Sequence, residues 1–165
     1  TAFTITPQEA LWDGTLQYST DGQNWAAFGT AGATAADDGS GTYKLYLQGT
    51  DNTRISAATT NAIAWTLTAA GTVACSGNIE ALLDHAAVAA GQHPAMADYC
   101  FANLFTNWTA LVQAPALPAT TMTTYCYGRM FLGCTGLTRA PVLPAMTLAP
   151  VWCCGRLCRR CQLPT

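Results

Sequence analysis

Two adjacent stretches decide how this chain is organised: 97–122, which reads ADYCFANLFTNWTALVQAPALPATTM, and 123–148, which reads TTYCYGRMFLGCTGLTRAPVLPAMTL. They align without a gap at a period of 26 residues, and eleven of the 26 positions are identical. Average amino-acid usage would give about two identities. A period between about 20 and 29 residues is typical of leucine-rich repeats, so the alignment predicts two stacked coils.

The second copy carries a motif that runs aromatic-x-aromatic, a small apolar stretch, Gly-Cys, Leu-Thr and an extended segment that ends in proline. Its residues are Tyr125, Tyr127, Met130, Phe131, Gly133, Cys134, Leu137, Thr138 and Pro144. This motif resembles the BspA-type leucine-rich repeats of bacterial surface proteins and of phage-encoded or gut metagenomic relatives. The first copy departs from it, with Asn107-Trp108 in place of Gly-Cys. The resemblance implies a solenoid used for adhesion or attachment, and it implies no catalysis.

The repeats also predict where a partner would bind. One repeat cannot bury its own apolar face, so neighbouring copies must stack. The pattern L-x-x-L-x-L predicts short strands that begin at Leu111 and Leu137, and 121–131 is expected to form a short helix or helical turn on the convex side. The concave face would then present four candidate binding residues, with a merely solvated face as the alternative: Gln113, Pro115, Arg139 and Pro141.

Residues 1–75 are predicted to form a small β-rich, immunoglobulin-like sandwich. Apolar and polar residues alternate over 43–48 and 63–68, which is typical of half-buried strands. Asp21-Gly22 predicts a hairpin turn. The strands are expected to close on Trp25, Tyr43 and Trp65. These aromatic residues could instead line a sugar site, since their rings stack on pyranose rings.

Residues 76–96 change to a helical period and predict a helix that links and caps the two parts. This segment holds the polar residues Asp84, His85 and His93, and Ser76 lies close in sequence. A Ser-His-Asp hydrolase is therefore a distant alternative. Nothing in the sequence marks a nucleophile elbow or an oxyanion loop, so exposed polar residues on a helix are the plainer interpretation.

The cysteines allow two interpretations of the tail, 149–165. Four of them gather there, and four thiols are a weak case for zinc: Cys153, Cys154, Cys158 and Cys161. A shift of 27 residues also aligns the tail with the second copy, which favours a degenerate, truncated or misread third repeat. Cys100 and Cys126 occupy the same repeat position and are expected to stack inside the coils as small apolar side chains. We therefore predict no metal and no cofactor.

Composition narrows the functional classes further. Only 10% of the residues are charged; residues 1–100 carry a net charge of −7 and 101–165 carry +5. Few arginines and an acidic first half argue against nucleic-acid binding, and no apolar run reaches the length of a membrane span. The predicted fold class is α+β, a β-sandwich-like domain followed by a short leucine-rich-repeat solenoid.

The predicted function is a non-enzymatic adhesion or binding module of a cell surface or virion, located outside the cell, for a host or cell-surface protein or glycan. The alternative is a purely structural segment of a longer phage tail fibre or surface protein.

Overall fold

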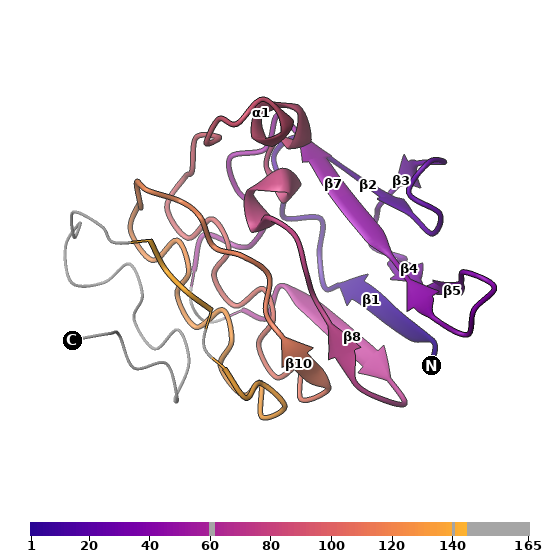
Figure 1. The fold of residues 1–165 in the computed structure, drawn as a ribbon. Helices are drawn as coiled ribbons and strands as arrows, with labels where there is room; N and C mark the ends of the chain where they lie inside the picture. The colour runs from indigo at the N-terminus through magenta and orange to yellow at the C-terminus, as the bar shows by residue number, and fades with distance from the viewer. Residues whose placement is uncertain (60–61, 140, 145–165) are drawn as a thin grey trace.

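The computed structural model describes residues 1–59, 62–139 and 141–144, and the secondary structure within them is short and mostly β (Figure 1). The strands are β1 (Phe3–Pro7), β2 (Thr15–Ser19), β3 (Ala26–Ala27), β4 (Ala33–Thr34), β5 (Ala36–Asp37), β6 (Tyr43–Lys44), β7 (Tyr46–Thr50), β8 (Trp65–Ala69), β9 (Val73–Ala74) and β10 (Leu111–Gln113). A 3₁₀ helix, η1 (Ile79–Leu82), and an α-helix, α1 (His85–Ala89), complete the set.

The strands form four small sheets. Three are antiparallel, with the strand orders β4-β1-β8, β3-β2-β7 and β5-β6. The fourth pairs β9 with β10 in parallel and joins the N-terminal part to the first repeat. Phe28 packs against Trp65 with ring centroids 5.3 Å apart, so a β8 residue lies beside the residue that follows β3 in the core.

The predicted hairpin turn between β2 and β3 is confirmed. Gly22 adopts a φ of 76°, and the Asp21 carboxylate accepts hydrogen bonds from the amides of Gln23 and Asn24, each at 2.8 Å. A glycine tolerates this left-handed conformation because it has no Cβ. The turn therefore brings Tyr18 opposite Ala26.

The long linking helix predicted over 76–96 is wrong. Only η1 and α1 form, and each begins at a side-chain cap: Asn78 Oδ1 accepts from the Glu80 amide at 2.8 Å, and Asp84 Oδ1 accepts from the Ala87 amide at 2.9 Å. Asp84 itself has extended backbone, with φ −151° and ψ 104°, so the chain leaves helical geometry between η1 and α1.

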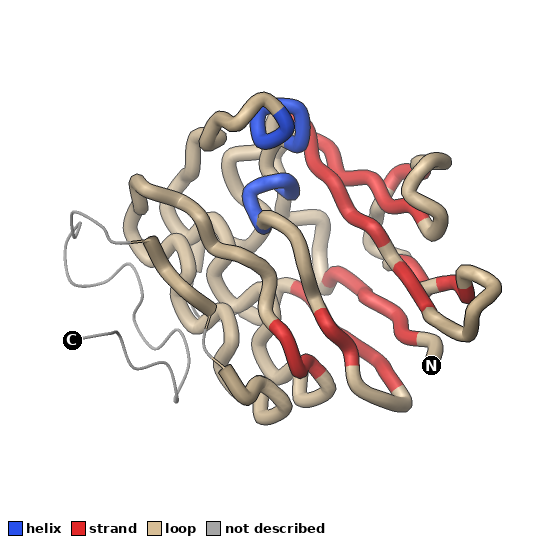
Figure 2. The backbone as a smooth tube through the Cα atoms, in the orientation of Figure 1, coloured by secondary structure: helices blue, strands red, loops and turns tan. Residues whose placement is uncertain are grey.

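The predicted fold class is also wrong. The described residues form mostly small antiparallel sheets with almost no helix, and no leucine-rich-repeat solenoid is established (Figure 2). The first copy supplies only β10, and no strand forms at Leu137–Arg139 among the described residues of the second copy. No helix forms over 121–131, where the chain makes a series of turns instead.

The backbone explains why the repeats make no helix. Positive φ values recur at every fourth residue and at the same positions of both copies: Tyr99, Asn103 and Asn107 in the first, and Tyr125, Arg129 and Gly133 in the second. Such residues interrupt a right-handed helix. In this stretch, the amide of every second residue of the first copy donates to a carbonyl of the second copy: Tyr99 to Thr124, Phe101 to Cys126, Asn103 to Gly128, Phe105 to Met130 and Asn107 to Leu132. Amides that a helix would use internally thus join the two copies.

Equivalent aromatic residues of the two copies lie against one another. The ring centroids of Phe105 and Phe131 are 5.3 Å apart with nearly parallel planes, and Tyr99 stacks on Tyr125 at 5.3 Å. Cys100 and Cys126 are both fully buried. We call residues 99–137, which these contacts hold together, the repeat stack.

The N-terminal part covers the outer side of the first copy. The amides of Ile55 and Ser56 donate to the Cys100 carbonyl at 2.9 and 3.2 Å. The Trp108 indole N–H donates to the Trp65 carbonyl at 2.9 Å. One hydrophobic cluster therefore continues from Ile5 to Leu137, and the domain boundary placed at residue 75 stays a prediction.

Candidate functional site

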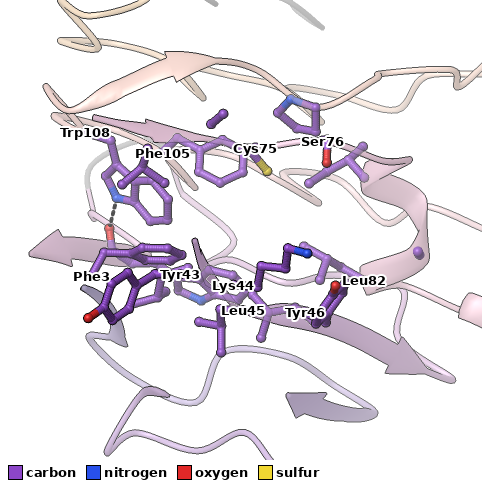
Figure 3. A pocket seen from close by; sticks show the side chains of 18 of the residues that line it. Phe3, Tyr43, Lys44, Leu45, Tyr46, Cys75, Ser76, Leu82, Phe105 and Trp108 are labelled. Atoms are coloured by element: carbon purple, nitrogen blue, oxygen red, sulfur yellow. Dashed lines mark hydrogen bonds between the residues drawn. The ribbon is translucent and has the colours of Figure 1, made fainter. Parts of the chain in front are cut away.

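A cavity of about 780 Å³ lies between the β7 layer and the strands β1, β8 and β9 (Figure 3). This volume falls within the range of about 300–1,000 Å³ common for small-molecule pockets. We call it the inter-sheet cavity. Its lining combines aromatic and aliphatic side chains with a few polar ones, among them Phe3, Tyr43, Lys44, Leu45, Tyr46, Gln48, Trp65, Cys75, Ser76, His85, Phe105 and Trp108.

The three aromatic residues proposed for either the core or a sugar site all line this cavity. Trp65 is only 1% exposed and belongs to the core, whereas Trp25 and Tyr43 remain half-buried. The two interpretations therefore divide between residues: core packing holds for Trp65, while Trp25 and Tyr43 border open space.

Charge is scarce around the inter-sheet cavity. Lys44 forms an ion pair of 2.8 Å with Asp38, and this hydrogen bond raises the pKa of the lysine. No carboxylate belongs to the described lining of the cavity. A pair of carboxylates, which glycoside hydrolysis normally needs, is therefore not gathered there.

Three of the four predicted binding residues surround a second, shallower depression of about 320 Å³. It is lined by Val112, Gln113, Ala114, Thr138, Arg139 and Pro141, and we call it the surface hollow. Gln113 and Arg139 are exposed. The fourth predicted residue, Pro115, is buried and lines the inter-sheet cavity instead. The structure therefore gathers Gln113, Arg139 and Pro141 and separates Pro115 from them.

The candidate hydrolase residues take structural roles. His85 Nδ1 lies 2.9 Å from the Gly49 carbonyl oxygen, and the Asp84 carboxylate caps α1. The hydrogen bond from the Ala87 amide lowers the pKa of Asp84. Ser76 and His85 both line the inter-sheet cavity, but the hydrogen bonds of Asp84 and His85 to backbone groups do not join them into a Ser-His-Asp relay.

One buried acidic residue, Glu80, was not predicted from the sequence. The Glu80 side chain is fully buried, and its Oε2 lies 2.7 Å from Nδ1 of His93, whose side chain is 46% exposed. Glu80 Oε1 has no hydrogen-bond partner among the described residues. Thirteen positions separate the two residues, and Glu80 stands inside an apolar run, so no local pattern could predict the pair.

Among the described cysteines, Cys100, Cys126 and Cys134 are buried and Cys75 is half-buried. Burial raises the pKa of the Cys75 thiol to about 11 and raises that of Cys100 as well; a thiol in this state carries little reactive thiolate at neutral pH. No group of three metal-binding side chains occurs within the described parts of the chain. The weak zinc candidates Cys153, Cys154, Cys158 and Cys161 lie outside them.

Across the residues that the structure describes, no helix has the length and apolar character needed to cross a membrane. Comparison with protein-family models, with curated proteins and with solved structures finds no match to this chain.

Proposed function

We propose that this chain is a non-enzymatic binding module of a cell surface or virion, and that the surface hollow is where it meets a host or cell-surface protein or glycan. One observation carries the proposal. Gln113 and Arg139 occupy equivalent positions of the two copies and border the same hollow. Two long polar side chains are thus presented together by the stacking of the copies.

The chemistry of the hollow favours a partner that carries a carboxylate. Arg139 is exposed and forms no ion pair among the described residues. A guanidinium offers a fork of donors that fits a carboxylate in two parallel hydrogen bonds. Gln113 adds both a donor and an acceptor, and Pro141 provides a rigid apolar wall. An acidic side chain or an acidic sugar would fit this set.

The test is binding of the labelled chain to a panel of intact bacterial and epithelial cells. Arg139→Ala should weaken binding about tenfold, since it removes a charge-assisted pair, and Arg139→Lys should recover only part of the loss. Thr135→Ala, exposed and outside the hollow, is the matched control. Binding by Arg139→Ala that equals the wild type would refute the role of the hollow.

The second candidate, a structural segment of a longer phage tail fibre or surface protein, is favoured by the outer edges of β7 and β9. Each of these strands pairs on one side only among the described residues. This candidate expects the isolated chain to bind none of the cells and to associate instead with neighbouring segments of its parent protein.

A further inference from the structure

The inter-sheet cavity is bordered by two uninterrupted runs of backbone. One comprises every residue from Gly41 to Gln48, and the other every residue from Thr72 to Ser76. Successive side chains of a strand point to opposite faces. A cavity that touches every residue of a run therefore meets the edge of the strand rather than one face. The edges of β7 and β9 thus border the same space.

Neither edge pairs with a further strand among the described residues, although the Gly49 carbonyl near the end of β7 already lies 2.9 Å from His85 Nδ1. β7 pairs with β2 alone, and β9 pairs with β10 alone. The amides of Val73 and Cys75 donate to the carbonyls of Ala110 and Gln113. By the alternation of backbone groups along a strand, the amide of Ala74 points away from β10. Open strand edges of this kind are templates for another strand.

The far side of the cavity is an apolar floor. Phe3, Ile5 and Trp65 come from the sheet β4-β1-β8, and Phe105 and Trp108 come from the first repeat. Leu45 and Leu47, on the β7 side, remain only half-buried. The Trp65 indole N–H is buried without a hydrogen-bond partner among the described residues. The space thus has an apolar base and two polar backbone edges.

We propose that the inter-sheet cavity receives an extended segment of another polypeptide, which adds as a β-strand between β7 and β9. The inserted strand would join β10, β9, β7, β2 and β3 into one continuous sheet over β4-β1-β8. That arrangement completes a two-layer sandwich, and it follows from strand edges and cavity shape alone. The proposal is independent of the surface hollow, because the two sites share no lining residue.

The lining also defines what the inserted segment must look like. An inserted segment of about five or six residues would match the run 43–48 that borders the cavity. Apolar side chains at alternate positions would cover Trp65 and Phe105. Lys44 is the one charged Lys, Arg, Asp or Glu side chain in the described lining and is already paired with Asp38, so the outward positions are expected to be polar without a preference for either charge.

Selection from a phage-displayed library of random nonapeptides tests the proposal. Enriched peptides should alternate apolar and polar residues. Hydrogen exchange of the complex should slow at 43–48 and 72–76, and the tryptophan fluorescence should change. Methylation of peptide amides that face β7 or β9 should weaken binding about tenfold by removing backbone hydrogen bonds, while methylation of the first or last residue should not.

The protein side has a matched pair of variants. Ala74→Pro removes the amide at the open edge of β9, and Ala27→Pro makes the same change on the exposed strand β3, outside the cavity. Only the first should weaken peptide binding; if it fails to fold, the methylated peptides on the wild-type chain give the same answer. The proposal would be overturned if no peptide were enriched, if the enriched peptides lacked alternation, or if other strands became protected. It would also be overturned if the small amphiphiles octyl glucoside or decanoate changed the tryptophan fluorescence and no peptide did, because the cavity would then bind a small apolar ligand.

Discussion

The repeat stack and the N-terminal sheets bury their apolar residues to very different degrees. In the stack, Phe101, Leu104, Tyr127 and Met130 are fully buried. In the sheets, Ile5, Leu16 and Trp65 are buried, but Phe3, Leu45 and Leu47 are only half-buried and border the inter-sheet cavity. The same chain therefore contains one region that is well packed and one that leaves space between its layers.

The difference follows from how the backbone amides and carbonyls of each region find hydrogen-bond partners. In the stack, the amides of one copy donate to the carbonyls of the next, and the aromatic rings follow the same register. The sheets are two or three strands wide and end in open edges at β7 and β9. A repeated sequence supplies its own partner, whereas these sheets need one from elsewhere.

The largest expected effect comes from removing the sheets. A fragment of 97–165 should show no cooperative thermal melt by circular dichroism, because the contacts of Ile55, Ser56 and Trp65 with the first copy are lost. A cooperative melt from this fragment alone would show that the stack does not depend on the sheets.

Substitutions in the two regions should differ in cost. Phe131→Ala and Leu137→Ala remove buried side chains and should lower the free energy of unfolding by about 2–5 kcal/mol. Leu45→Ala, at a half-buried position beside the cavity, should cost about 1 kcal/mol. Chemical denaturation of the three variants measures this. Equal losses at Leu45 and Phe131 would mean that both regions are equally well packed.

Loss of the partner of Glu80 should have an intermediate effect. His93→Ala leaves a fully buried carboxylate without its hydrogen bond, and we expect a cost of about 1–3 kcal/mol. The double variant Glu80→Gln/His93→Ala should be less destabilised than the sum of the two single variants, because the two residues interact directly. Additive losses in thermal melts would argue against the pair.

The smallest effect is expected at the surface hollow. Arg139 is exposed, and surface substitutions usually change stability by less than about 0.5 kcal/mol. The Arg139→Ala variant should therefore have the same melting temperature as the wild type, although its binding to cells is weakened. A large loss of stability would instead place Arg139 in a structural role.

Local patterns predicted part of this fold. The alternation at 43–48 and 63–68 falls on β6, β7 and β8, the Asp21-Gly22 turn forms, and the alignment at a period of 26 pairs Phe105 with Phe131. The prediction of a helix over 121–131 failed because apolar spacing does not show where backbone φ becomes positive, and the helix predicted over 76–96 is interrupted at the extended backbone of Asp84. Tyr99 and Arg129 adopt such values, although neither residue type favours them.

The candidate site was less predictable for a related reason. Gln113 and Arg139, at equivalent repeat positions, line the same hollow because the copies stack in register, and their role in binding stays a prediction. The same logic misplaced Pro115, which lies where β10 meets the N-terminal strand β9 and faces the inter-sheet cavity. That cavity depends on contacts between strands far apart in sequence, and local patterns of apolar and polar residues do not predict such contacts.

Residue-resolved amide hydrogen exchange tests the contrast between the two regions most directly. The account predicts slow exchange at alternate residues of the first copy, Tyr99, Phe101, Asn103, Phe105 and Asn107, whose amides donate to the second copy. It predicts fast exchange at Ala74, whose amide faces the open edge of β9. The intervening amides of Ala102, Leu104 and Thr106 donate within the first copy, so their protection does not test the contact between the copies. Fast exchange at the five inter-copy amides would show that the backbones of the copies are not joined, and strong protection of Ala74 in the isolated chain would show that its edge is already paired; either result would contradict the contrast between the two regions.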